Sequence, residues 1–402
     1  MGTFARLALS IGAAALFGGC GGFQESIGVP QAPAAVRAAH APPSFVYLAQ
    51  CCQPQFSNKG NVTLYDLGLG KVARTITKGI SNPWTITVDR SGRLYVVGFG
   101  YTQGLIEYDA GSDRPSRRIK LSYAWAAATD ASNDLYAASC PECHEYVTGK
   151  GFVNVYAAGT TNLLRSIKDG INSPMSLALD TYGNLYVFNG NGSHTAVLVY
   201  ARGSSKLLRS LPQGYTDISA IALDRSNNLF VIRSPVSGQA TVVEYKADSN
   251  KVVRTISKGI RSPQALALDS SGNLYVANTP FPSAGWVSVY SPGSSTPSYR
   301  ITSGMDDPQL LAIDGDGNLY VGNDDYAVAL VRPGVSSGDN GSVCTYSANS
   351  KKPLRCIATQ QWSFPYSLAV TPQKKPASQS DFSPLRNPSD YGTINMPMCW
   401  CG

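Results

Sequence analysis

One pattern recurs along most of this 402-residue chain and limits what the chain can fold into. Its clearest copy starts at Ser262 and reads SPQALALDSSGNLYVANTPFPSAGWVSVYSPGSSTPSYRIT. Each copy holds four short apolar runs (ALALD, NLYVAN, VSVY and RTI are typical) that favour strands and are separated by turn residues. The aspartate that ends the first run marks each copy, and successive markers are 41 to 50 residues apart: Asp89, Asp130, Asp180, Asp224, Asp269 and Asp314.

Four strands in each 40–50 residues predict the blades of a β-propeller, because a single such sheet must stack on neighbours to bury its faces. Composition agrees with this interpretation. The chain is 43% apolar and 15% charged, which is too apolar for disorder. Its 39 glycines and 25 prolines are too many for a helical bundle, so we expect an all-β fold.

The two ends of the repeat region complete each other. The last copy stops after the run at 366–371, which is of the ALALD type. The first run, at 45–49, is of the LYVAN type, and NVTLYD and ARTI follow it. We expect three N-terminal strands and one C-terminal innermost strand to form the last blade, because this closure removes an open edge. The prediction is a seven-bladed β-propeller over residues 44–371.

The LYVAN-like and VxVY-like strands resemble those of the NHL and YVTN repeat propellers over about residues 44–371. In NHL-type propellers the ALALD strand lines the central channel from the top face downward. The resemblance therefore implies that the residue five before each marker lies at the upper mouth. It is weak for function, because propellers host many unrelated activities.

These mouth positions combine an arc of aromatic residues and methionine with an arc of amides. Such a surface suits sugars or peptide side chains, so we expect a protein, peptide or carbohydrate ligand there. The alternative is that the aromatic side chains fill the channel as core. Asn189, Asn278, Asn323 and Arg233, at the ends of second strands, are further candidate contacts. The predicted mouth residues are Trp84, Trp125, Met175, Ser219, Gln264, Gln309 and Tyr366.

Residues 1–19 are predicted to be an export signal. Arg6 precedes an apolar run at 7–17 that is too short to span a bilayer, and small residues lead to Cys20. The segment resembles a bacterial lipoprotein signal, which implies acylation of Cys20 and a lipid-anchored protein in the periplasm or on the cell surface. An ordinary secretory signal cut nearby is the alternative. Residues 20–43 are predicted to be an Ala/Pro-rich tether, and 372–402 an irregular tail.

The chain has nine cysteines, and an even number remains if Cys20 is acylated, which suits an oxidising compartment. Cys344 and Cys356 lie nearly equidistant from the turn of one predicted hairpin, so we expect a cross-strand disulfide. Cys140-Pro-Glu-Cys143-His144 matches the pattern for covalent haem attachment. The loop is short for wrapping a haem, so we expect a loop disulfide and keep a haem c carrier as the remote alternative. The pairing of the other cysteines stays open: Cys51, Cys52, Cys399 and Cys401.

No catalytic set is evident. The three histidines, His40, His144 and His194, lie off the predicted inner strands. We therefore expect a non-enzymatic binding or scaffold module without a cofactor. A propeller enzyme resembling lactonases or streptogramin lyases stays open as the alternative, and so does a metal. Asp314-Gly-Asp316-Gly-Asn318 resembles the start of a calcium loop, but we interpret it as a hairpin turn.

The net charge of +7 is spread without a basic cluster, so we expect no nucleic-acid partner and a monomer that meets the membrane through its lipid only. An arginine recurs in each predicted outermost strand, where charge would block edge-to-edge pairing. These residues are Arg74, Arg117, Arg165, Arg209, Arg254, Arg300 and Arg355.

Overall fold

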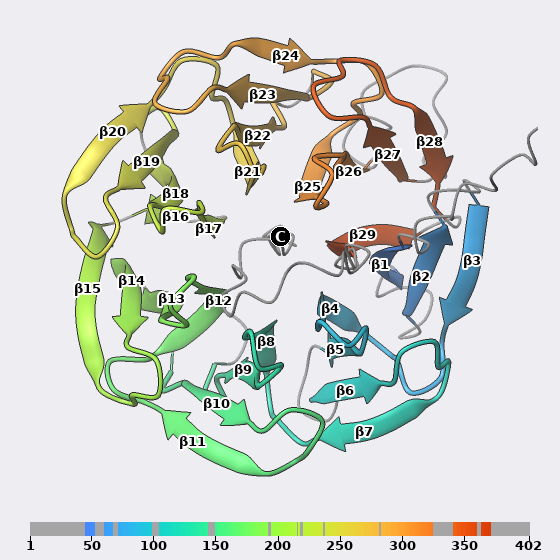
Figure 1. The fold of residues 1–402 in the computed structure, drawn as a ribbon, viewed down its shortest axis with the longest axis vertical. Coiled ribbons are helices and arrows are strands. Elements are labelled where there is room, and N and C mark those ends of the chain that lie inside the picture. The colour runs from blue at the N-terminus through green and yellow to red at the C-terminus, as the bar shows by residue number, and fades with distance from the viewer. Residues whose placement is uncertain are drawn as a thin grey trace, which may run out of the picture. The chain divides into compact units, whose positions relative to one another are not determined.

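The computed structural model describes residues 45–52, 60–66, 71–98, 104–143, 149–191, 194–214, 216–217, 220–235, 238–280, 283–324, 341–359 and 363–370. Every regular element in these ranges is a β-strand, and the strands form seven antiparallel sheets around a common axis (Figure 1). The predicted all-β, seven-bladed propeller is confirmed. In the same ranges there is no helix long and apolar enough to cross a membrane.

Six blades contain four strands each, and in five of them the strands follow chain order from the axis outward. Blade one is β4 (Pro83–Val88), β5 (Leu94–Gly98), β6 (Leu105–Tyr108) and β7 (Pro115–Ile119); blade two is β8 (Ala124–Thr129), β9 (Leu135–Ser139), β10 (Phe152–Tyr156) and β11 (Leu163–Ile167); blade three is β12 (Ser173–Leu179), β13 (Leu185–Asn191), β14 (His194–Tyr200) and β15 (Leu207–Gly214). Blade five is β21 (Pro263–Leu268), β22 (Leu274–Asn278), β23 (Trp286–Tyr290) and β24 (Tyr299–Ile301); blade six is β25 (Pro308–Ile313), β26 (Leu319–Asn323), β27 (Ser342–Tyr346) and β28 (Arg355–Ala358).

Blade four departs from the repeat at its inner edge. Its outer strands are β18 (Leu229–Pro235), β19 (Thr241–Tyr245) and β20 (Val252–Ile256). Two short strands, β16 (Thr216–Asp217) and β17 (Ile221–Leu223), both pair with β18 where the other blades have one innermost strand. The predicted mouth residue Ser219 falls between them, outside the described residues.

Blade seven is closed by both ends of the repeat region, as predicted. Its order is β29 (Ser363–Val370), β1 (Phe45–Cys52), β2 (Asn61–Asp66) and β3 (Lys71–Ile76). Leu48 in β1 lies opposite Leu368 on one side and Thr63 on the other. The C-terminal strand is thus the innermost one, and the two ends of the repeat region are joined within one blade.

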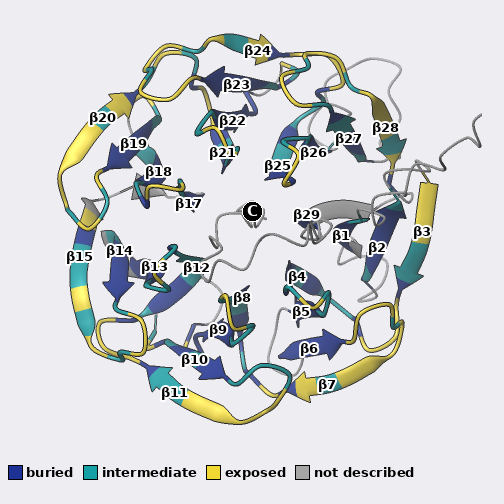
Figure 2. Ribbon diagram, viewed as in Figure 1, coloured by how far each residue is buried: buried dark blue, intermediate teal, exposed yellow. Residues whose placement is uncertain are grey.

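The hydrophobic core lies between blades. Seven clusters of buried side chains are present in the described residues, and each joins two neighbouring blades. The cluster between blades five and six, for example, packs Ala265 and Val289 against Leu311 and Val321. Figure 2 shows buried residues in the inner strands and exposed ones along the outer strands. The second strands of blades one, two, five and six are buried throughout because both of their faces are covered by neighbouring blades.

The recurrent arginines lie in the outermost strands, as expected, but several turn back into their own blade. Arg117 donates to the buried carboxylate of Glu107 at 2.8 Å, and Arg254 pairs with Glu244. Arg165 donates to the hydroxyl of Tyr136 at 3.0 Å. These arginines therefore also compensate buried polar groups, a role that was not predicted from the sequence.

Candidate functional site

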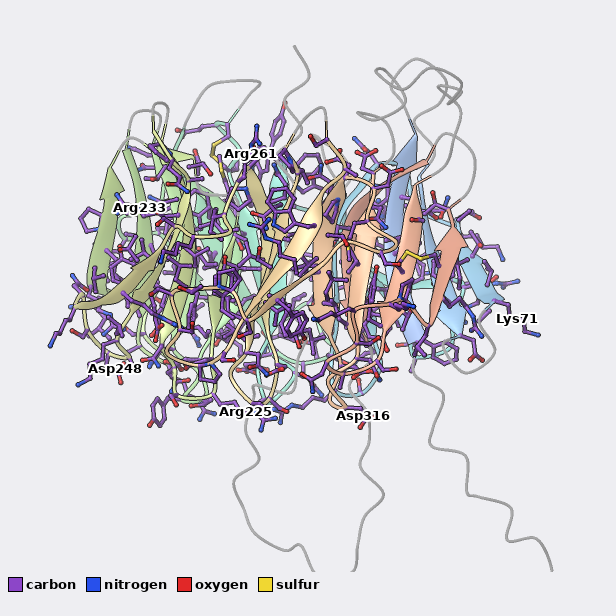
Figure 3. All side chains as sticks on the ribbon, turned by 90° about the horizontal axis from the view of Figure 1, so that it is seen from above. Lys71, Arg225, Arg233, Asp248, Arg261 and Asp316 are labelled. Carbon is purple, nitrogen blue, oxygen red and sulfur yellow. A yellow bond between two sulfur atoms is a disulfide. The ribbon has the colours of Figure 1, made fainter. Side chains whose placement is uncertain are left out.

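The ring has two faces, which Figure 3 shows from the side. We call the face that carries Arg233 and Arg261 the upper face, and the opposite face, with Arg225 and Asp316, the lower face. β21 begins two residues after Arg261, so the innermost strands start near the upper face. Their marker aspartates end them near the lower face.

Five of the predicted mouth residues share an unusual backbone position. Each is skipped in the pairing between its innermost strand and the next strand, which makes it the extra residue of a β-bulge. A bulge breaks the regular alternation and re-aims a side chain. A proline precedes four of the five, and proline is tolerated at such positions because it has no N–H to pair. The five are Trp84, Trp125, Met175, Gln264 and Gln309.

All five side chains are half-buried. The rings of Trp84 and Trp125 meet edge to face, with centroids 6.0 Å apart and an interplanar angle of 85°. The hydroxyl of Thr85 donates to the carbonyl of Trp125 at 3.0 Å, which joins the two bulges across neighbouring blades. Trp84 and Met175 each also pack against a core cluster between blades. Each side chain thus buries one part in the core and leaves the rest accessible.

Two positions of the predicted ring have no described side chain. Ser219 lies outside the described residues, and Tyr366 belongs to β29 without a described side chain. The structure therefore places the pair of tryptophans together and puts Met175, Gln264 and Gln309 at equivalent bulges of blades three, five and six.

A titratable group that was not predicted from the sequence lies beside Gln309. Asp307 has a backbone φ of 57° and a side-chain hydrogen bond with Gln309. Burial raises the pKa of its carboxyl to about 7, and the negative charge of Asp324 adds to the effect. The signal in the sequence was the aspartate before Pro308, where blades three and five have serine.

The asparagines at the ends of second strands are not available to a ligand. Asn189, Asn278 and Asn323 are at most 4% exposed. Their carboxamide oxygens accept hydrogen bonds from backbone N–H groups of the incoming loops, such as Arg261 N to Asn278 at 2.8 Å. The expectation that these residues contact a ligand was wrong, since their polar atoms hold each blade to the loop that leads into it.

Both expected disulfides are present. Cys344 and Cys356 are direct register partners on β27 and β28. Cys140 and Cys143 form a loop disulfide, and Cys143 Sγ lies 3.1 Å from Ser173 Oγ at the start of β12. His144, Cys20, Cys399 and Cys401 lie outside the described residues, as do the side chains of Cys51 and Cys52. Disulfides persist in oxidising compartments, so the two pairs fit an extracytoplasmic location.

The marker aspartates are structural. Asp314 Oδ1 accepts from the backbone N–H groups of Asp316 and Asn318. Asp314 Oδ2 accepts from Asn318 Nδ2 at 2.9 Å and from the Tyr320 hydroxyl at 2.7 Å. The segment 314–318 is therefore a hairpin turn. Nowhere in the described ranges do three or more His, Cys, Asp or Glu residues group as metal ligands. His194, expected in a loop, is instead the first residue of β14.

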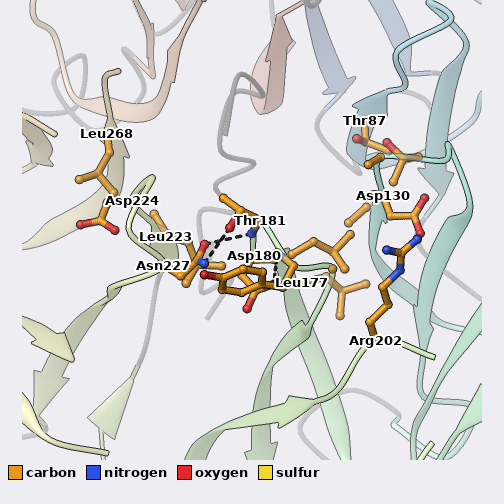
Figure 4. A pocket seen from close by; sticks show the side chains of 18 of the residues that line it. Thr87, Asp130, Leu177, Asp180, Thr181, Arg202, Leu223, Asp224, Asn227 and Leu268 are labelled. Carbon is orange, nitrogen blue, oxygen red and sulfur yellow. Dashed lines mark hydrogen bonds between the residues drawn. The ribbon is translucent and has the colours of Figure 1, made fainter. Parts of the chain in front are cut away.

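A cavity of about 170 Å³ opens at the other end of the channel from the mouth residues (Figure 4). It lies where the innermost strands end, near the lower face. Apolar side chains such as Ala128, Leu177 and Leu223 form part of its wall. Asp130 and Arg202 also line it. The site predicted from the sequence lies only at the upper mouth, so this cavity was not predicted.

The strand pairing defines this chain as a seven-bladed β-propeller. Comparison with known proteins does not narrow this class further. No family model matches the chain, and no curated protein matches it. A protein of unknown function from Bacteroides caccae is 13% identical, with a TM-score of 0.46 over 66% of this chain and 97% of that chain. Hydrazine synthase from Kuenenia stuttgartiensis is 14% identical, with a TM-score of 0.49 over 69% and 96% of the respective chains. Similarity this low carries no argument about what this chain does.

Proposed function

We propose that this chain is an exported, lipid-anchored bacterial propeller that binds a carbohydrate or peptide at its upper mouth and catalyses no reaction. The observation that supports this most is the Trp84–Trp125 pair. Two half-buried indoles from adjacent bulges offer a large apolar contact surface. The amides of Gln264 and Gln309, at the equivalent bulges of blades five and six, supply donors and acceptors for a ligand's polar groups.

The cellular location is part of the proposal. The signal at 1–19 and Cys20 lie outside the described residues, so their support is the sequence pattern, to which the two disulfides add. The test is the intact mass of the protein purified from its native membrane without reductant. We expect the mass of the chain from Cys20 plus acyl groups, less about two mass units per disulfide. A mature N-terminus elsewhere, without lipid, would exclude the anchor.

The binding test is a screen of glycans and short peptides against the purified mature chain, followed by titration of any hit by calorimetry. Trp84→Ala and Trp125→Ala are each expected to weaken binding at least tenfold, since central aromatic side chains carry much of the free energy of binding. Leu354→Ala is the matched control, because Leu354 is 67% exposed near the outer strand β28, away from the innermost strands. Binding that both tryptophan variants leave unchanged would place the ligand elsewhere.

A further inference from the structure

The hairpins that carry the marker aspartates share one hydrogen-bonding scheme, in which the residue four later donates a side-chain N–H to the marker's Oδ2. Asparagine does this in blades three to six, with distances of 2.7 to 2.9 Å. In blade one, Arg93 Nε donates to Asp89 Oδ2 at 2.8 Å. The marker's Oδ1 accepts two backbone N–H groups in each case, as in Asp180. Both carboxylate oxygens are therefore satisfied within the hairpin.

Blade two breaks this scheme. Its marker, Asp130, accepts the backbone N–H groups of Ser132 and Asp134 at Oδ1, at 2.8 and 2.9 Å. The residue four later is Asp134, whose carboxylate has no N–H to donate and instead accepts from Ala158 N at 3.0 Å. Among the residues that the structure describes, none donates a hydrogen bond to Asp130 Oδ2.

The electrostatics of Asp130 agree with this local geometry. Burial raises the pKa of its carboxyl, and the negative charge of Asp134 acts in the same direction. Its two backbone hydrogen bonds and the positive charge of Arg202 oppose this, but the net direction is upward. The carboxylate is thus partly desolvated and incompletely compensated, a state that a nearby cation would stabilise.

Asp130 also lines the lower cavity, which gives such a cation a place to bind. Figure 4 shows its carboxylate near the guanidinium of Arg202. Two further markers, Asp180 and Asp224, line the same cavity, but their oxygens are already bonded within their hairpins. The remaining wall includes Ala128 and Leu177. A volume of about 170 Å³ is close to that of an engineered apolar cavity of about 150 Å³ that binds benzene.

We propose that the lower cavity is a second binding site, which takes a small organic amine. The ammonium group donates to Asp130 Oδ2, and the apolar body of the ligand packs against Ala128, Leu177 and Leu223. This site is separate from the upper mouth and does not depend on the function proposed there. Arg202 is exposed at the rim and competes with the ligand for the same carboxylate.

The test is calorimetric titration of the purified mature chain with benzylamine, with benzyl alcohol as the neutral probe of matching shape. We expect benzylamine to bind at least tenfold more tightly than benzyl alcohol. Asp134→Asn should abolish this preference without unfolding the protein, because its amide would donate to Asp130 Oδ2 as in the other blades. Arg202→Gln should strengthen benzylamine binding severalfold. Asp316→Asn is the charge-matched control, since Asp316 is exposed on the lower face outside the cavity lining.

Three results would overturn the proposal. They are no binding of benzylamine, equal binding of benzyl alcohol, and benzylamine binding by Asp134→Asn as tight as by the unaltered protein. A fourth comparison keeps the two sites apart. Gln264→Ala, at the upper mouth and outside the cavity lining, should leave benzylamine binding unchanged, and loss of amine binding in that variant would also contradict a separate lower site.

Discussion

The hydroxyl of Tyr290 donates a 2.7 Å hydrogen bond to the carbonyl oxygen of Lys258, in the turn where the chain passes from blade four to blade five. Tyr290 ends the third strand of blade five and is fully buried. The contact therefore ties a blade to the turn that leads into it. The same bond recurs in three other blades: Tyr108 with Lys78, Tyr200 with Asp169, and Tyr346 with Ser303.

Tyr290→Phe is expected to lower the free energy of unfolding by about 1–2 kcal/mol, because it leaves the carbonyl of Lys258 without its tyrosine donor. Urea unfolding followed by tyrosine and tryptophan fluorescence would measure the change. Tyr182→Phe is the control, since Tyr182 is 65% exposed. An equal effect of both substitutions would contradict the structural role of the buried hydroxyl.

Gly259→Ala is expected to lower stability by about 2–3 kcal/mol, more than the loss from backbone strain alone. Gly259 has a φ of +80°, and an added Cβ would lie 2.9 Å from both the Tyr290 hydroxyl and Pro297 Cγ. Gly293→Ala separates the two causes. Gly293 has a φ of +75° with nothing within 4 Å of the added Cβ, so its loss should be about 1 kcal/mol. Thermal unfolding of both variants would measure the losses. Equal losses of stability in Gly259→Ala and Gly293→Ala would contradict the steric argument.

Removal of the hairpin disulfide by Cys344→Ala with Cys356→Ala is expected to lower the free energy of unfolding by about 2–3 kcal/mol, given the short loop that it closes. The measurement is thermal unfolding of the variant beside the unaltered protein, each with and without reductant. Reductant should destabilise the unaltered protein more than the variant. The same sensitivity in both would assign the effect to the Cys140–Cys143 pair instead.

Asp307→Asn is expected to change how stability depends on pH. The folded-state pKa of Asp307, about 7, lies above its ordinary value of 3.8, so the folded state binds more protons between these values. The contribution of Asp307 to the free energy of unfolding is therefore greatest below pH 4. It decreases as the pH rises to about 7 and stays low above that pH. The variant should be about 1–2 kcal/mol more stable than the unaltered protein at pH 8, after allowance for solvent screening, and should match it near pH 4.

Urea unfolding at pH 4, 6 and 8 would test this pH dependence. Asparagine tolerates the positive φ of position 307, and its amide oxygen can still accept from Gln309, so the substitution isolates the charge. Asp316→Asn, which removes a carboxylate at an exposed position, is the matched control. A constant difference between Asp307→Asn and the unaltered protein across this range would contradict the raised pKa.

Local pattern was sufficient for the architecture. The spacing of the marker aspartates and the two incomplete ends predicted seven blades and the pairing of β29 with β1, because each blade is a run of adjacent hairpins. The Cys344–Cys356 pairing followed in the same way, since both residues lie in one hairpin. Strand length, turn residues and hairpin register depend on residues that are close together in the chain, so they can be predicted from the sequence.

The sequence determined by itself the all-β class, the number of blades, the closure and the positions that begin each innermost strand. Only the tertiary structure decided which groups the individual side chains contact. It turned Arg117 toward Glu107, buried Asn278 against the backbone of Arg261, raised the pKa of Asp307, and left Asp130 facing a cavity. These outcomes depend on desolvation and on partners from other strands, other blades or the loops between them, and a pattern of neighbouring residues carries neither.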